Sequence, residues 1–386
     1  MVRASLRSEI SPFVVMDIMR ASAELEVAGR NIVHMEVGQP GTPAPRIVRE
    51  AVKAAIDRDV LGYTEALGIP GLRERIARHY RDAYGLEIGP ERVVVTAGSS
   101  AGFVLAFLAL FDAGTPILLP EPGYPCYRNI VQALGLKPVS VPVGPDERWM
   151  PTPELLTRAA SNGGEPKPEG ILFASPANPT GTVMTPPALA SICEWCRTQG
   201  VTIISDEIYH GLTYDTPAET ALRFDDEAIV INSFSKYFSM TGWRIGWMVV
   251  PPHLVRAVER LAQNFYISPT TVSQIGAIAA FDAIEELEAN KAVYARNREF
   301  LMEELPYAGF RKLAPADGAF YFYADISDLT DDSQAFAKML LEELGVAATP
   351  GVDFDPVRGR QFLRFSYAGT HEAMVEAVKR LRTLRG

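Results

Sequence analysis

The fold is indicated most clearly by the run Ala228-Ile229-Val230-Ile231-Asn232-Ser233-Phe234-Ser235-Lys236. Its first five residues are almost continuously apolar, which is typical of a short β-strand covered by helices on both faces. Similar runs occur at 93–96, 116–119, 138–141, 171–174, 201–205 and 247–250, and helical stretches such as 100–111 and 187–197 separate several of them. Strands that alternate with helices predict an α/β domain whose mostly parallel sheet has seven strands.

A second, smaller unit is predicted after Leu305, where the pattern changes. Aromatic-rich strands are expected at 320–323 and 362–365, and helices near 333–344 and 371–385. A further helix is expected at 13–28, with no strand partner close to it in the sequence. This mixture predicts a smaller α+β domain.

Composition narrows the class of protein. The chain has 386 residues, 47% of them hydrophobic and 22% charged, which is ordinary for a globular protein of two to three domains by size. Its net charge of −10 argues against nucleic acid as a main partner. No apolar run has the length of a membrane span, and the N-terminus lacks a signal-peptide core.

The three cysteines are too few for a disulfide framework, so a reducing cytoplasm is the expected compartment. Cys193 and Cys196 lie in a predicted helix, and neither a second cysteine pair nor a suitably spaced histidine accompanies them. We therefore expect no metal site.

Polar residues follow three of the predicted strands. Asn178, Asp206 and Lys236 each lie a few residues past, or directly at, the end of an apolar run. In open α/β sheets, ligands bind at the carboxyl ends of the strands. Taken singly, each residue has an ordinary alternative: a turn for Asn178, a helix cap for Asp206 and a solvated side chain for Lys236.

The surroundings of Lys236 suit a covalently held cofactor. A lysine amine can form a Schiff base with an aldehyde. The hydroxyls of Ser233 and Ser235 and the guanidinium of Arg244 can hold a phosphate. Pyridoxal phosphate has both groups. A second phosphate contact is expected at Thr96-Ala97-Gly98-Ser99-Ser100, where a strand leads into a helix whose N-terminal amides favour anions.

The ordered set of motifs resembles the class I/II aminotransferases, which are pyridoxal-phosphate enzymes of fold type I. The resemblance rests on four segments: Asn178-Pro179-Thr180-Gly181, Asp206-Glu207-Ile208-Tyr209, Ser233-Phe234-Ser235-Lys236 with Gly242-Trp243-Arg244-Ile245-Gly246, and Phe362-Leu363-Arg364-Phe365-Ser366. It extends from Val37 to Arg364, and each motif alone is weak evidence.

The resemblance implies a role for each candidate residue. Lys236 would hold the cofactor and move the substrate proton, Asp206 would keep the pyridine nitrogen protonated, and Tyr209 and Asn178 would bind the phenolic oxygen. The phosphate would contact Gly98, Ser99, Ser100, Ser233, Ser235 and Arg244. Tyr124 would stack on the ring, Arg364 would bind the substrate α-carboxylate, and Gly38 would leave room for the substrate.

The resemblance also implies a homodimer, in which Tyr63 reaches the phosphate of the neighbouring subunit. It further implies that residues 45–285 form the large cofactor-binding domain, while 1–44 and 286–386 together form the small domain.

The expected activity is transfer of an amino group between an amino acid and a 2-oxo acid by a ping-pong mechanism. A β-lyase with the same cofactor residues is the alternative, and a regulatory module is disfavoured because the first 40 residues contain no basic, DNA-binding stretch. The helix at 99–112 has no basic residue, which favours an amino donor with a neutral side chain. A cation from Arg20, from Arg128 or from a partner chain would reverse that expectation.

Overall fold

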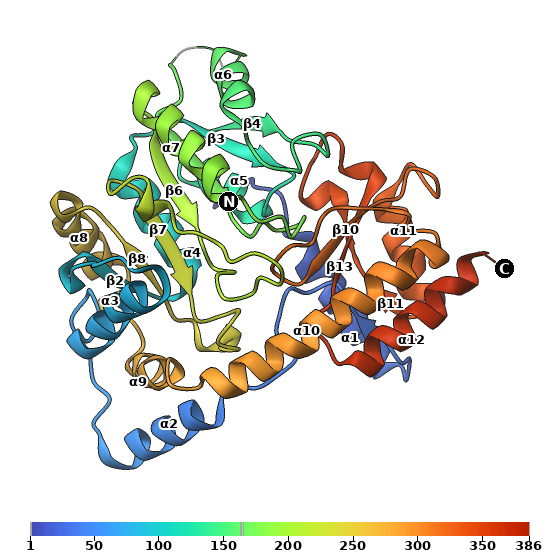
Figure 1. Ribbon diagram of the computed structural model, residues 1–386, viewed down its shortest axis with the longest axis horizontal. Coiled ribbons are helices and arrows are strands. Elements are labelled where there is room, and N and C mark those ends of the chain that lie inside the picture. The colour runs from blue at the N-terminus through green and yellow to red at the C-terminus, as the bar shows by residue number, and fades with distance from the viewer. Residues whose placement is uncertain (1, 163, 165, 386) are drawn as a thin grey trace.

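A seven-stranded sheet forms the centre of the larger part of the molecule (Figure 1). The computed structural model describes residues 2–162, 164 and 166–385. The strand order is β2-β8-β7-β6-β5-β3-β4, and all neighbours are parallel except β8, which is antiparallel to both β2 and β7. The strands are β2 (Val93–Thr96), β3 (Pro116–Glu121), β4 (Lys137–Pro142), β5 (Gly170–Ala174), β6 (Thr202–Asp206), β7 (Ile229–Ser233) and β8 (Gly246–Val249).

The side chains of this sheet alternate between two apolar layers, which explains why its strands read as continuous apolar runs. Ile203 points into the layer shared with α3 (Pro70–Tyr84), α6 (Pro153–Asn162), α7 (Pro186–Gln199) and α9 (Thr271–Ala280). Its neighbour Ile204 points into the opposite layer, which contains α4 (Gly98–Leu110), α5 (Pro125–Ala133) and α8 (Val255–Phe265). Because both faces are covered, almost every strand position is apolar. The predicted α/β fold and its seven strands are confirmed.

A second sheet, of four antiparallel strands, lies in the C-terminal part of the chain. Its order is β12-β13-β10-β9. The strands are β9 (Lys312–Leu313), β10 (Tyr321–Asp325), β12 (Thr349–Pro350) and β13 (Phe362–Ser366). Helices α10 (Ile284–Glu304), α11 (Ser333–Met339) and α12 (His371–Leu381) pack around this sheet in a separate apolar core.

The N-terminal segment lies against this C-terminal part. Strand β1 (Val33–His34) pairs in parallel with β11 (Val346–Ala347). Helix α1 (Val14–Val27) packs beside them, and α2 (Arg46–Arg58) then leads back towards the large sheet (Figure 1). The exact domain boundaries at residues 44 and 285 stay a prediction. Among the described residues, none of the helices combines the length and the apolar character needed to cross a bilayer.

Candidate active site

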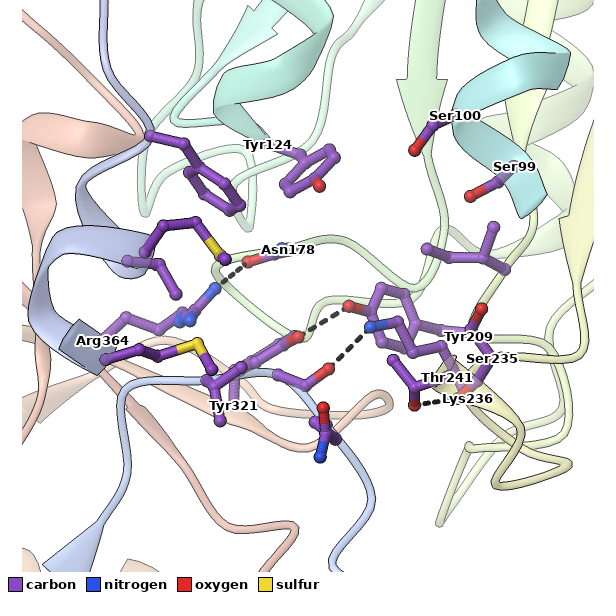
Figure 2. A pocket seen from close by; sticks show the side chains of 18 of the residues that line it. Ser99, Ser100, Tyr124, Asn178, Tyr209, Ser235, Lys236, Thr241, Tyr321 and Arg364 are labelled. Atoms are coloured by element: carbon purple, nitrogen blue, oxygen red, sulfur yellow. Dashed lines mark hydrogen bonds between the residues drawn. The ribbon is translucent and has the colours of Figure 1, made fainter. Parts of the chain in front are cut away.

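A cavity of about 470 Å³ lies at the carboxyl ends of the central strands, between the large sheet and the C-terminal sheet (Figure 2). Side chains distant in sequence converge on it, which is the arrangement expected at the carboxyl edge of an open α/β sheet. Ten of the residues predicted from the sequence line it: Gly38, Ser99, Ser100, Tyr124, Asn178, Tyr209, Ser235, Lys236, Arg244 and Arg364.

Lys236 points into the cavity from the connection that follows β7. Its Nζ donates a hydrogen bond to the carbonyl oxygen of Gly38 at 2.6 Å (Figure 2). Burial and, to a smaller extent, the neighbouring cations Arg364 and Arg244 lower the pKa of the Lys236 amine to about 8, against the opposing effect of Asp206. A substantial fraction of this amine is therefore neutral, and so nucleophilic, near physiological pH.

Asp206 lies behind the cavity at the end of β6 and is fully buried. One carboxylate oxygen accepts a hydrogen bond from the Tyr127 hydroxyl, and the other accepts from the Ile208 amide at 3.1 Å. Burial raises the pKa of Asp206 to about 6, against the opposing effect of these two hydrogen bonds. Asp206 is thus an oriented carboxylate that is mostly ionised at neutral pH.

The phosphate contact predicted at Gly98, Ser99 and Ser100 lies where α4 begins. The residue before this helix, Ala97, provides no side-chain cap, so the first amides of the helix are left for a ligand. The Arg244 guanidinium lies close to Gly98: a Cβ atom there would come within 2.5 Å of Arg244 Nη2. Only glycine therefore allows the guanidinium to approach the helix N-terminus. Arg244 itself has φ +50°, a backbone strain that is common at functional sites.

The serines after β7 complete this end of the cavity. Ser235 lines the cavity, whereas Ser233 lies behind it and donates a hydrogen bond to the Ser235 hydroxyl at 2.8 Å. The Thr241 hydroxyl donates to the Ser235 carbonyl at 2.9 Å and also lines the cavity. Ser233 and Thr241 thus hold the Ser235 segment in place.

Arg364 approaches from β13 on the opposite side and is only 2% exposed. Its Nη1 donates to Asn178 Oδ1 at 2.9 Å (Figure 2), and its Nη2 donates to the Glu36 carbonyl. The guanidinium carbon lies 4.4 Å from the centre of the Tyr321 ring and 4.7 Å from that of Phe354. These contacts fix the guanidinium in one plane, as bidentate binding of a carboxylate requires.

Sequence reasoning missed Tyr321 and Tyr127. The Tyr321 hydroxyl lies 2.6 Å from that of Tyr209. A Cβ atom on Gly38 would overlap the Tyr321 hydroxyl, so this glycine makes space for the tyrosine. Tyr321 lies in the strand predicted at 320–323, and Tyr127 lies in α5, a helix that the sequence patterns do not predict. Nothing in their local sequence indicates that they contact the site.

Helix α1 was also missed as part of the site. Phe13, Val15, Met16 and Met19 line the cavity and give it an apolar wall. The Phe13 ring meets the Tyr124 ring edge-on, with 5.7 Å between the centroids. A helix with these apolar residues was expected at this position, but its sequence does not indicate that it lies over the site.

Tyr63 is the one predicted site residue that lies away from the others. Its side chain is 82% exposed, and it does not line the cavity of its own chain. A role for Tyr63 at an active site therefore requires a second subunit.

The side chains present fit pyridoxal phosphate. A lysine amine with a lowered pKa, a buried carboxylate and an uncapped helix N-terminus beside an arginine match its aldehyde, its pyridine nitrogen and its phosphate. The fold and the cavity together define a pyridoxal-phosphate-dependent enzyme of fold type I.

Within that class, the family model described as aminotransferase class I and II matches residues 30–381, and the chain belongs to this family. The valine–pyruvate aminotransferase of Mycobacterium tuberculosis is 48% identical over 383 residues, which cover 98% of this chain and 97% of that protein. A crystal structure of an aminotransferase from Mycobacterium tuberculosis covers 99% of both chains with a TM-score of 0.96 and 48% identity. The aspartate aminotransferase from Thermus thermophilus with maleate covers 100% of both chains with a TM-score of 0.93 and 30% identity.

The protein is therefore a pyridoxal-phosphate-dependent aminotransferase that moves an amino group between an amino acid and a 2-oxo acid. The family, the enzyme class and the cofactor expected from the sequence are confirmed. The roles of the individual side chains stay predictions.

Proposed function

We propose that the amino donor of this enzyme has a neutral, apolar side chain. The observation that supports this most directly is the distribution of charge around the cavity. Among the described residues, the cations that line it are Lys236, Arg244 and Arg364. Each of them is already predicted to act at the cofactor or at the α-carboxylate. A second substrate carboxylate would have no further cation as a partner, and a carboxylate that is buried without a partner is costly.

The two arginines considered as additional cations are engaged elsewhere. Arg128 donates to Glu121 at 3.0 Å and to the carbonyl of Asp353 at 3.3 Å, and it does not line the cavity. Arg20 pairs with Asp17 at 2.9 Å on the exposed side of α1. The apolar wall of α1 supplies the complementary feature, since it can bury an aliphatic or thioether side chain.

The relatives agree with this proposal to different degrees. The relative that is 48% identical is named for valine and pyruvate, whereas several relatives named for aspartate are 30–32% identical. Valine has the type of side chain that the α1 wall would accept.

The proposed division of work among the side chains follows from their positions. Bound pyridoxal phosphate supplies an electron sink for the charge that develops at the substrate Cα. Asp206 keeps the pyridine nitrogen protonated, and Asn178 and Tyr209 bind the phenolic oxygen. Arg364 orients the α-carboxylate. The Lys236 amine removes the proton from the substrate Cα and, as the resulting ammonium, donates that proton in the next step of the amino transfer.

A donor panel tests the proposal. We expect kcat/KM for valine, leucine and methionine, with a common 2-oxo acid acceptor, to exceed the values for aspartate and glutamate by at least about tenfold, or about 1.4 kcal/mol. Met19→Arg, which places a cation in the wall, should shift the preference towards aspartate, and Met19→Leu should not. A wild-type enzyme that prefers aspartate tenfold would refute the neutral-donor proposal. Product formation that requires the acceptor also separates transamination from β-elimination.

We also propose a homodimer in which Tyr63 of each chain reaches the phosphate end of the other chain's site. The exposed position of Tyr63 supports this, as do exposed apolar residues close to it in sequence or on a neighbouring segment, such as Val60, Phe265 and Ile267.

A cytoplasmic location is proposed from the cysteines, because all three are free thiols, including the buried Cys193 and Cys196 on one helix.

A further inference from the structure

Helix α1 is attached to the protein mainly through the C-terminal part of the chain. Val15 and Ser22 are its fully buried residues, and other side chains of α1 pack on Leu341 and Ala347. Its cavity-facing residue Met16 is 55% exposed. Figure 1 shows α1 beside the C-terminal part of the chain, so the position of the apolar wall depends on the contacts that hold α1 there.

The N-terminus of α1 is capped by a residue that is distant in sequence. Phe13 occupies the N-cap position and has no side chain suited to capping. Instead, Oδ1 of Asp353 accepts a hydrogen bond from the Val14 amide at 3.4 Å. The Asp353 side chain is buried, with 4% exposure, and its Oδ2 has no hydrogen-bond partner among the described residues.

The charge of Asp353 suits this position. Burial raises the pKa of the Asp353 carboxyl to about 6, against the opposing effect of the Val14 amide and the Arg364 guanidinium. The group is therefore mostly ionised at neutral pH. A carboxylate is favoured at a helix N-terminus because the helix dipole is positive there.

The turn that contains Asp353 lies between two residues that contact Arg364. Asp353 ends a short 3-10 turn, Gly351–Asp353, that directly follows β12. Thr349, on β12, accepts from Arg364 Nη2 at 3.3 Å, and the Phe354 ring lies 4.7 Å from the Arg364 guanidinium carbon. The residues on either side of the turn thus contact Arg364, while Asp353 contacts the first turn of α1.

We infer that Asp353 is a positioning residue for substrate specificity: by capping α1, it holds the apolar wall at a fixed distance from Arg364. The side chain of the donor is then enclosed when its α-carboxylate is bound. This inference rests on the proposed function, since it takes the α1 wall as the surface that receives the substrate side chain.

The test compares leucine with alanine as amino donors in the holoenzyme. Asp353→Ala should raise KM for leucine about fivefold, the change in equilibrium that the loss of an average helix cap produces. Alanine has a single methyl group to bury, so its KM should change by less than about twofold. Asp353→Asn, which keeps a capping oxygen, should restore most of the leucine-to-alanine preference.

A matched control removes a different cap. Thr185 caps α7 by accepting from the Ala188 amide, also at 3.4 Å, on a helix that covers the large sheet. Thr185→Ala should lower the melting temperature without changing the ratio of the kcat/KM values for leucine and alanine.

A second variant removes the same hydrogen bond from the other side. Val14 is the first residue of α1, where proline is tolerated, and the extended conformation of Phe13 is compatible with a following proline. Val14→Pro should reproduce the effect of Asp353→Ala, and the double variant should add little to either one.

Amide hydrogen exchange of the peptide at 13–27 provides a readout that does not depend on catalysis. Exchange should be faster in Asp353→Ala and near wild type in Asp353→Asn. Unchanged exchange, or faster exchange with an unchanged leucine-to-alanine ratio, would overturn the inference. A failure of the neutral-donor proposal is recognised separately, because it would appear in the donor panel of the wild-type enzyme.

Discussion

Replacing Arg364 by lysine is the most informative perturbation of the substrate end of the site. The guanidinium lies between two aromatic rings, and its Nη1 is bound to Asn178 at 2.9 Å. Its Nε has no hydrogen-bond partner among the described residues, although the atom is buried. A buried donor without a partner is expensive, and the substrate α-carboxylate is the ligand that would satisfy it.

The size of the effect follows from the hydrogen bonds lost. A lysine keeps the charge but loses the planar, two-point contact, which is about one charge-assisted hydrogen bond, or roughly 1.5–3 kcal/mol. We therefore expect Arg364→Lys to lower kcat/KM by a factor of about 10 to 150. Arg364→Met leaves the bound carboxylate without a partner, at a cost of about 3–5 kcal/mol, which corresponds to a loss of roughly 150- to 5,000-fold.

The assay compares L-alanine with ethylamine, which is alanine without its carboxylate. If Arg364 acts on the carboxylate, its replacement lowers kcat/KM for alanine and leaves the already low value for ethylamine nearly unchanged. Arg298→Lys is the control, because Arg298 lies 5.3 Å from the Tyr214 ring and binds the Ala316 carbonyl away from the cavity. An alanine-to-ethylamine ratio that stays at its wild-type value in Arg364→Lys would refute the assignment.

Three further predictions concern the cofactor end of the site and the subunit contact. Lys236→Ala should abolish both the covalent labelling of the protein by cofactor and borohydride and nearly all turnover. In the wild-type apoenzyme, the rate of cofactor attachment should increase with pH and level off above about 8, where the Lys236 amine is neutral. A rate that still increases at pH 10 would contradict the lowered pKa of Lys236. Asp206→Asn should bind cofactor but have a severely reduced kcat, because a neutral amide cannot keep the pyridine nitrogen protonated. A normal kcat with weaker cofactor binding would mean that Asp206 only helps to hold the cofactor in place. Mixing Tyr63→Phe chains with Lys236→Ala chains should restore activity in exchanged dimers, which then contain one fully native site; a fully active monomer would exclude a shared site.

The sequence predicted the part of the site that is organised by the large sheet. Asn178, Asp206 and Lys236 could be placed together because parallel strands deliver their carboxyl ends to one edge. The strand limits were correct to within two residues; for example, 247–250 was expected where β8 spans Gly246–Val249. Both successes depend on short-range patterns that the chain repeats in each strand.

Near the two ends of the chain, Gly38 and Arg364 were predicted only through the family resemblance, and the apolar wall of α1 was not predicted. Phe13, Met16 and Met19 form an ordinary amphipathic pattern, and only tertiary packing determines that they face the cavity rather than a buried core. Tyr127 differs, since its contact with Asp206 spans 79 residues and depends on how α5 crosses the sheet edge. Contacts of this kind leave no local signal.

The separation of the site between the middle and the ends of the chain has a consequence for how such enzymes diversify. Within one chain, the side chains expected to bind its own cofactor lie between Ser99 and Arg244, whereas the wall and the arginine expected to bind the α-carboxylate come from α1 and β13. Mutations near the two termini can therefore accumulate, and change which amino acid is accepted, while cofactor affinity stays under independent selection. Recombination that exchanges terminal segments between relatives would be expected to produce new donor preferences on an unchanged catalytic centre.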